Sequence, residues 1–133
     1  MPKHPLIMMS AHMETVDHLA FVIDWLSAPV DLIDGLAAYG VSGMPAPPHP
    51  ERSPSGITQH QAAELARQVG LPVVTEMTML HVDALEGHPG LQTCEYLRVH
   101  GREGLLDVLQ DEPKRSARLV SAVAWASPTG QVQ

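Results

Sequence analysis

Residues 71–90 read LPVVTEMTMLHVDALEGHPG, and this segment constrains the fold more than any other part of the chain. The apolar run from Pro72 to Val74 predicts a buried strand. In an α/β sheet, a buried strand typically presents polar side chains at its C-terminal end. Here the run is followed by Thr75, by a single acid, Glu76, and then by residues 77–79, which read Met-Thr-Met. The segment therefore predicts a site at a strand end that has only one carboxylate.

The N-terminal half alternates between strand and helix patterns. Residues 5–10, PLIMMS, predict a first buried strand, and residues 13–27 place apolar side chains at helical spacing. Residues 29–34 predict a second strand, and residues 57–70 predict a second helix that ends at a glycine. This order indicates an α/β fold with a mixed central sheet flanked by helices.

The C-terminal half predicts two short helices and a long strand. Helical patterns cover residues 91–110, with Gly101 between them. Residues 115–127 alternate in the way of a strand, with the odd-numbered positions 117–125 on one face. Residues 127–133 then give a turn followed by a short stretch of a partner strand. The long strand is expected either to be an edge, which favours association, or to be covered by something outside this chain.

Residues 44–56, MPAPPHPERSPSG, differ in composition from their surroundings. They hold five of the twelve prolines and almost no large apolar side chain, so they predict a loop or flap. At 133 residues, the chain is long enough for one sizeable core. We therefore expect a single domain over residues 1–133 that carries this proline-rich loop.

Composition excludes several classes of function. Fifteen acidic residues against eight lysines and arginines give a formal net charge of −7, which argues against a nucleic-acid partner. The single Cys94 excludes an internal disulfide and a cysteine-built zinc site. No apolar run approaches the roughly 20 residues of a membrane span, and the N-terminal apolar run is too short for a secretory signal. These features predict a cytoplasmic protein without a membrane partner.

The motifs GLPVV, VDALEGHPG, EGLLDVL, RSARLVSAVAWAS and PTG, in this order, resemble the inosine triphosphate pyrophosphatase family, also called the Ham1 or non-canonical purine nucleoside triphosphate pyrophosphatase family. The resemblance covers residues 57–130 and extends back towards residue 6. It implies the ITPase-like fold (the Maf and Ham1 type), with a long mixed sheet, a cleft between two lobes and usually a dimer. The C-terminal third of a typical member, which carries base-recognition and phosphate-recognition motifs, has no counterpart here.

The resemblance also implies a chemistry, since family members hydrolyse deaminated purine nucleoside triphosphates to a monophosphate and pyrophosphate with magnesium (Mg²⁺). The family's phosphate loop ends its first strand; this chain keeps Ser10 there, but has His12 for an asparagine and Thr15 for a lysine. The family's second helix carries a lysine and, three residues later, an acid that helps to bind the metal. These positions are Gln61 and Glu64, so one half of the pair is retained.

At the end of the strand, the family has two adjacent acids, then serine or threonine, then glycine. The corresponding residues are Glu76, Met77, Thr78 and Met79, so a thioether replaces the second acid. A further family lysine corresponds to Cys94. Removing one charged group that acts in a transition state commonly lowers the rate by about 10²–10³. The missing lysines and acid therefore predict a catalytically degenerate member.

The polar residues that remain define the candidate site. Glu76 and His12 end strands that the family places side by side, so they are the candidate acid/base pair. Glu64 and Glu76 are the candidate metal ligands if the magnesium-dependent activity persists. The candidate ligand-binding residues are Ser10, Met77, Thr78, Met79 and His81. Solvated surface roles for His12, Glu64 and His81, and core roles for the methionines, stay open alternatives.

Three hypotheses follow for the function. In the first, which we favour, a repurposed cleft lined with methionine binds a less charged small molecule, with acid/base chemistry by Glu76 and His12. In the second, the chain is a non-catalytic subunit that forms a homodimer or pairs with a homologous partner chain. In the third, it is a residual magnesium-dependent nucleoside triphosphate pyrophosphatase.

Overall fold

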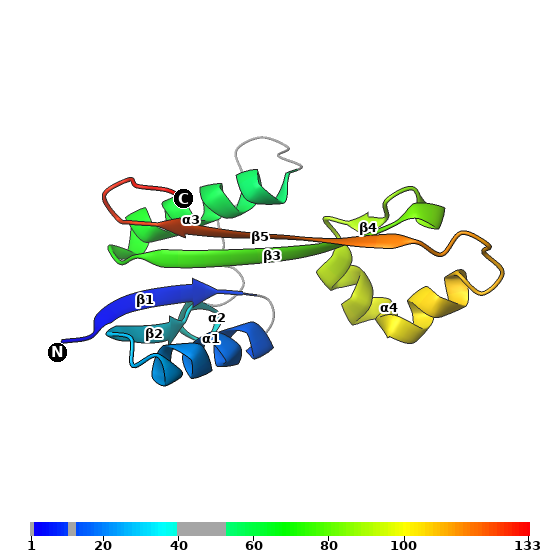
Figure 1. Cartoon of the computed structure of the whole chain (residues 1–133). Coiled ribbons are helices and arrows are strands. Elements are labelled where there is room, and N and C mark those ends of the chain that lie inside the picture. The colour runs from blue at the N-terminus through cyan, green and yellow to red at the C-terminus, as the bar shows by residue number, and fades with distance from the viewer. Residues whose placement is uncertain (1, 11–12, 40–52) are drawn as a thin grey trace. The chain divides into compact units, whose positions relative to one another are not determined.

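A computed structural model of the protein describes residues 2–10, 13–39 and 53–133, and Figure 1 shows the order of its helices and strands. The elements are β1 (His4–Met9), α1 (Met13–Trp25), β2 (Val30–Asp34), α2 (Gly35–Tyr39), α3 (Pro54–Val69), β3 (Val73–Val82), the short 3-10 helix η2 (Asp83–Leu85), β4 (Pro89–Gly90), α4 (Thr93–Val108) and β5 (Ala117–Ala126). Within the described residues, no helix is long and apolar enough to cross a membrane.

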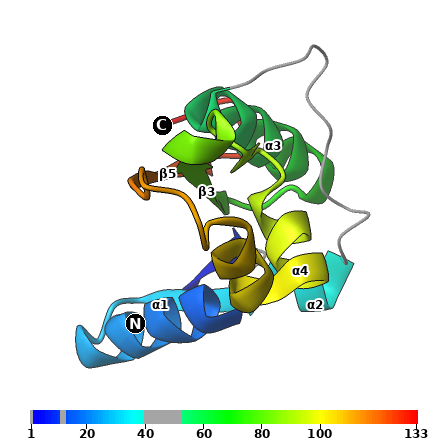
Figure 2. The same ribbon diagram turned by 90° about the vertical axis from the view of Figure 1, so that its right-hand side faces the viewer.

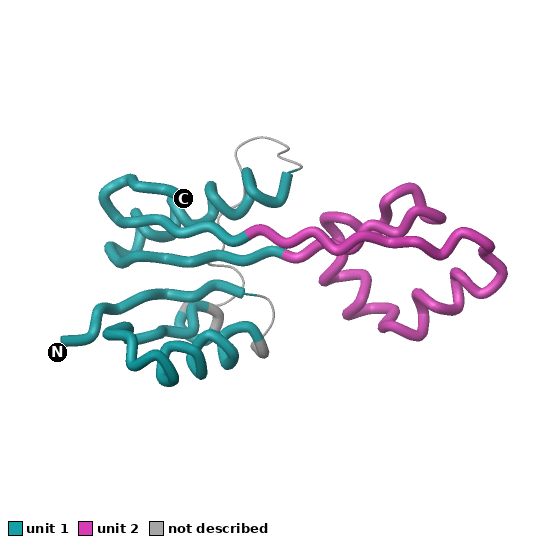
Figure 3. Tube along the Cα trace, in the orientation of Figure 1, with its two compact units in different colours: residues 1–77, 123–133 teal, residues 78–122 magenta. Residues whose placement is uncertain are grey.

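The chain divides into two compact units (Figure 3). Unit 1 comprises residues 1–77 and 123–133, and unit 2 comprises residues 78–122. The strands β3 and β5 contribute residues to both units. The single domain that we expect from the length of the chain stays a prediction.

Unit 1 is built on parallel strands. β1 pairs with β2 on one side and with β3 on the other, and Ile7 lies opposite both Ile33 and Val73. Parallel strands need crossover connections, which α1 and the pair α2 and α3 supply here. Right-handed crossovers place α1 and α3 on opposite faces of the sheet, and the two helices lie apart in both views (Figures 1 and 2).

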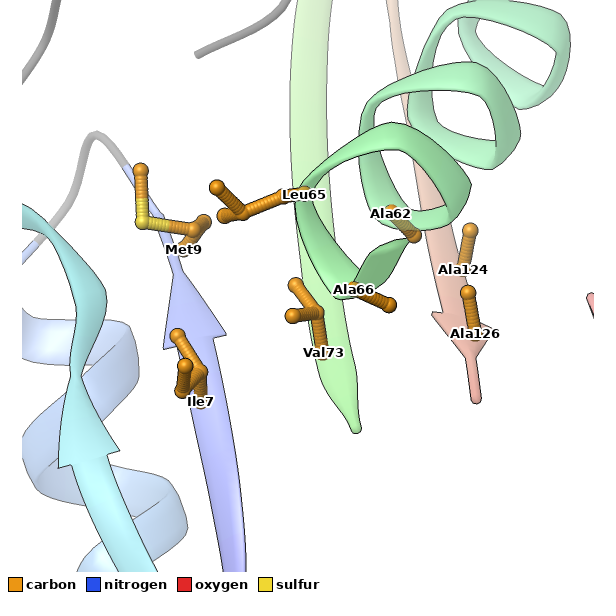
Figure 4. Close-up of a cluster of buried hydrophobic side chains, with 8 residues drawn as sticks. All are labelled: Ile7, Met9, Ala62, Leu65, Ala66, Val73, Ala124 and Ala126. Atoms are coloured by element: carbon orange, nitrogen blue, oxygen red, sulfur yellow. The ribbon is translucent and has the colours of Figure 1, made fainter. Parts of the chain in front are cut away.

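The core of unit 1 lies between the sheet and α3. Figure 4 shows the side chains of the sheet and the helix that form one buried cluster. Alternation along β1 and β3 sends every second side chain to this face. The cluster consists of Ile7, Met9, Ala62, Leu65, Ala66, Val73, Ala124 and Ala126.

The helix α3 begins at Pro54, three residues before the predicted start. Ser53 is its N-cap, with φ −83° and ψ 133°, and the Ser53 hydroxyl accepts a hydrogen bond of 2.9 Å from the Gly56 amide. A proline at the first helical position follows the usual preference. The end of the predicted loop 44–56 is therefore helical, while residues 44–52 lie outside the described part of the chain.

Ser53→Ala is expected to lower the free energy of unfolding by about 1 kcal/mol, because it removes the side-chain acceptor at the start of α3. Ser53→Asp keeps an acceptor at the same place and is expected to retain the stability of the unchanged protein. Urea denaturation of both variants measures the difference. Equal stability of the alanine and aspartate variants would contradict a capping role.

The strand β3 is longer than the sequence pattern predicts. Residues 76–79 were expected to follow the strand, but they lie inside it, so that prediction is wrong. The reason is β5, which pairs with β3. The Thr78 and Ser121 hydroxyls are 2.7 Å apart, and the Asp83 amide donates to the Ser116 carbonyl at 3.0 Å. Numbers rise along β3 as they fall along β5, so the two strands are antiparallel.

The strand β5 buries the face with small side chains. Ala124 and Ala126 are fully buried, whereas Leu119 and Val123, on the odd-numbered face, are 72% and 66% exposed. The last residues of the chain fold back on the end of β5, because Trp125 and Gln133 exchange two backbone hydrogen bonds of 2.8 Å. The predicted pairing of the C-terminal residues with this strand is confirmed.

Unit 2 joins the second half of β3 to β4 and α4. The Leu80 amide donates to the Thr93 hydroxyl at 2.9 Å, and that hydroxyl donates to the Gly90 carbonyl. The helix α4 is interrupted at Gly101, where φ is 68° and ψ is 177°. The predicted division into two helical segments at this glycine is confirmed, because an extended conformation with positive φ strongly favours glycine.

Candidate functional site

Ser10 and Glu76 form a hydrogen-bonded pair in unit 1. Met9 lies opposite Thr75 in the parallel register of β1 and β3, so the next residue of each strand comes to the same level. The Ser10 hydroxyl donates to Glu76 Oε2 at 2.9 Å, and Ser10 is 3% exposed. The pair lies where β1 ends and β3 continues. Two of the predicted site residues are therefore brought together.

The Glu76 side chain points to the face of the sheet away from α3. Its neighbour Thr75 donates a hydrogen bond of 2.7 Å to the Thr58 carbonyl, which belongs to α3. Successive side chains of a strand point to opposite faces. Glu76 thus lies on the other face from the core cluster, which agrees with its partial exposure.

Glu64 lies on α3 and pairs with Arg67. The Arg67 Nη2 and Nε atoms donate to its two carboxylate oxygens at 2.8 Å and 3.2 Å. Glu64 and Arg67 also line an open hollow of about 560 Å³, together with His60 and the turn of residues 127–130. The hydrogen bond from the guanidinium lowers the pKa of Glu64 from its usual range. The Glu64 carboxylate is therefore bound by Arg67, which lies on the same helix.

The described donors do not fit a magnesium site shared by Glu64 and Glu76. Magnesium prefers an octahedron of oxygen ligands. Glu64 is engaged by Arg67 on the helix, Glu76 points away from that helix, and the Met77 thioether is a poor ligand for this ion. The part of the chain that the structure describes contains no group of three ligand-type side chains suited to a metal. A shared metal site stays a prediction without geometric support.

Arg67→Gln is expected to raise the pKa of Glu64 towards its ordinary value, because it removes the guanidinium that stabilises the carboxylate. The lowered pKa favours folding at neutral pH, and this contribution disappears as the pH falls through the carboxyl pKa. A carboxyl-detected NMR titration measures the shift. Arg98→Gln is the matched control, since it should move the pKa of Glu95 alone. An unchanged Glu64 titration in Arg67→Gln would disprove the pairing in solution.

Three other predicted ligand-binding residues have neighbours within unit 2. Thr78 is hydrogen-bonded to Ser121, and Met79 is buried, with 4% exposure. His81 packs on the glycine-rich turn, where a Cβ added to Gly90 would lie 3.7 Å from the His81 Cε1 atom. Their contact with a ligand stays a prediction.

Two predicted residues remain. Met77 is half-buried and ends unit 1 along β3. His12, the predicted partner of Glu76, lies outside the described residues. The sequence predicts Ser10 as a ligand contact but does not indicate that Ser10 donates a hydrogen bond to Glu76. The available signal was a small hydroxyl residue directly after the first buried strand.

Comparison with known families decides the relationship. A profile described as the Ham1 family matches residues 24–133. The chain belongs to the Ham1 family. Similar proteins include the dITP/XTP pyrophosphatase of Methanopyrus kandleri, 31% identical over 100 residues, and that of Nocardia farcinica, 35% identical over 109 residues. Each match covers 72% of this chain and 53% of the relative, so the chain spans about half the length of these curated relatives.

Solved structures share this fold. The nucleoside-triphosphatase, or dITP/XTP pyrophosphatase, of Mycobacterium abscessus superposes with a TM-score of 0.68 at 26% identity, and the match covers 97% of this chain and 69% of that one. The Staphylococcus aureus Ham1 protein has a TM-score of 0.66 at 15% identity, covering 97% and 66%. The predicted ITPase-like fold, with a mixed sheet flanked by helices, is confirmed.

Proposed function

We propose that this Ham1-family chain binds a small, weakly charged molecule at the Ser10–Glu76 pair and that Glu76 exchanges a proton with it. The observation that carries this proposal is the 2.9 Å hydrogen bond that Ser10, directly after β1, donates to the partly exposed carboxylate of Glu76 on β3. A carboxylate in this setting accepts hydrogen bonds from N–H and O–H groups of a ligand. The ligand class is therefore one that carries such donors.

The charge of the retained positions favours a ligand without a polyphosphate. By resemblance, the family's lysines correspond to Thr15, Gln61 and Cys94, none of which is a cation. A carboxylate beside a triphosphate needs lysines, arginines or metal ions to offset the negative charge. Glu76 without those cations repels a polyphosphate and suits a neutral ring or a hydroxylated molecule.

Ser10 orients Glu76 for proton transfer. The hydrogen bond that its hydroxyl donates to Oε2 fixes the position of the carboxylate that would remove a proton. Because Ser10 is buried and follows a paired strand, its hydroxyl is held in place rather than free in a loop. In this proposal, His12, which lies outside the described residues, is the second acid/base group and returns a proton to the ligand.

A thermal-shift panel tests the proposal with hypoxanthine, xanthine, inosine and xanthosine against their triphosphates. Bases and nucleosides are expected to stabilise the chain, and Glu76→Gln is expected to remove the shift. Ser10→Ala should reduce the shift, because Glu76 then loses the hydrogen bond that holds its carboxylate in place. Glu112→Gln, an exposed acid in unit 2, is the matched control. Stabilisation by triphosphates alone would overturn the proposal.

A residual pyrophosphatase is the second candidate, since the relatives in Methanopyrus and Nocardia bear the name dITP/XTP pyrophosphatase. The test is release of pyrophosphate from inosine or xanthosine triphosphate with Mg²⁺. If the chain releases pyrophosphate and Glu76→Gln abolishes the release, this candidate replaces the first. No release, together with nucleoside binding, favours the repurposed site.

A further inference from the structure

The helix α1 carries an exposed apolar surface that the proposed function does not use. Phe21 and Trp25 are 70% and 76% exposed, and Val22 and Leu26 are 43% and 61% exposed. Each pair is spaced by four residues, so the four side chains lie along one side of the helix. We call these four residues the α1 stripe. The backbone continues the helical turn through Leu26, whose amide donates to the Val22 carbonyl at 2.9 Å.

The α1 stripe extends beyond the face that packs on unit 1. Val16 is 9% exposed and Ile23 is partly buried, and helical spacing places both well away from Phe21 and Trp25. Leu26 follows Ile23 by three residues and adjoins the packed face. The apolar surface of the helix therefore continues from its own unit into solvent, where the two aromatic rings lie. Single exposed apolar residues are ordinary, but a contiguous group that includes two large aromatic rings marks an interaction site.

Apart from His18, the titratable residues of α1 are all acids: Glu14, Asp17 and Asp24. Asp31 and Asp34 follow on β2, and the exposed Lys3 directly precedes β1. Asp17 and Asp24 are exposed, and they precede and follow Phe21 by four and three residues, so they border the stripe on the helix. His18 is also exposed on this side of the helix. The surface is thus an apolar strip with an acidic border.

We propose that the α1 stripe docks a partner protein through an amphipathic segment whose apolar side chains are flanked by lysines or arginines. Apolar anchors and complementary charge at the border are the two features that such a segment supplies. A second copy of this chain fits less well, because a two-fold contact brings identical surfaces together and would set Asp17 and Asp24 against acids of the same helix. The α1 stripe shares no residue with the Ser10–Glu76 pair.

Binding of a synthetic leucine/lysine amphipathic helix tests the proposal. In a Trp125→Phe background, Trp25 is the single tryptophan, since the chain has two. We expect a blue shift of its emission with the leucine/lysine peptide and none with a leucine/glutamate peptide of the same length. Phe21→Ser and the pair Asp17→Lys with Asp24→Lys should each weaken the binding by about tenfold, the equivalent of about 1.4 kcal/mol. Calorimetry on the unmodified chain checks the ranking.

Leu119→Ser is the matched control, because Leu119 is equally exposed but lies on β5. It should bind the peptide as the unchanged chain does, and circular dichroism verifies that every variant is folded. Equal binding of the acidic peptide, no binding of the basic one, or equal loss in Leu119→Ser would overturn the proposal. Self-association that Trp25→Ser abolishes would assign the stripe to a second copy instead.

Discussion

Leu65→Ala is expected to lower the free energy of unfolding by about 2–5 kcal/mol, the usual range for a leucine removed from a core. Leu65 is 2% exposed on α3, and its side chain points towards Met9 in the cluster between helix and sheet (Figure 4). The loss combines two contributions: the hydrophobic free energy of burying the isobutyl group, and the cost of the cavity that its removal leaves. Methionine is flexible and can move into part of that cavity, so we expect a value in the lower half of the range.

Chemical denaturation monitored by circular dichroism measures this loss. Leu106→Ala is the matched control, because Leu106 also lies on a helix, α4, but is 47% exposed. It is expected to cost less than about 1 kcal/mol, since much of its apolar surface is already in water. If both variants lose the same free energy, the cluster between α3 and the sheet does not dominate the stability of unit 1.

The longer elements of this fold could be predicted from the sequence because they follow from local patterns, whereas the short α2, η2 and β4 were not predicted. Apolar runs gave β1 and β2, helical spacing gave α1 and α3, and a glycine divided α4. What the local pattern could not supply was the contact between distant segments. β3 continues past Glu76 only because β5 lies beside it, about forty residues later along the chain.

Only part of the candidate site could be predicted, because the site also depends on contacts between distant segments. Glu76 follows a recognisable buried run, but its contact with Ser10 depends on the register between β1 and β3. The face on which Glu64 lies depends on how α3 packs, and the structure pairs that carboxylate with Arg67. A family resemblance predicts which residue types occupy which positions of the chain. It does not establish that their side chains point towards a common ligand.

Alternation alone also does not decide which face is buried. On β5, alternation places the larger odd-numbered residues on one face without saying whether that face is buried, and the structure buries small residues such as Ala124 against α3 instead. On α1, Val22 and Leu26 continue the helical pattern of Val16, yet they are exposed. In both cases, apolar residues occupy two faces, and the packing partner decides which face is covered.

Gly35→Ala is expected to destabilise the protein by about 1–3 kcal/mol, the usual cost of overpacking a core. Gly35 begins α2, and its φ does not lie in the left-handed region, so backbone strain gives no reason for a glycine. Helix propensity and unfolded-state entropy predict the opposite sign, a gain of about 0.4–1 kcal/mol for alanine. A Cβ at this position would lie 2.1 Å from the Met9 Sδ atom and 2.9 Å from the Ile7 Cγ2 atom, and both side chains are fully buried.

Packing should win because two buried side chains would have to move together. A double-mutant cycle with Met9→Ala isolates the contact, since Gly35→Ala should cost less once the thioether is gone, with a coupling of about 0.5–3 kcal/mol. Thermal and urea denaturation of the four proteins supply the numbers. A stabilised Gly35→Ala variant, or a cycle with no coupling, would show that α2 does not pack against β1 as the structure has it. In that case, the glycine would be replaceable.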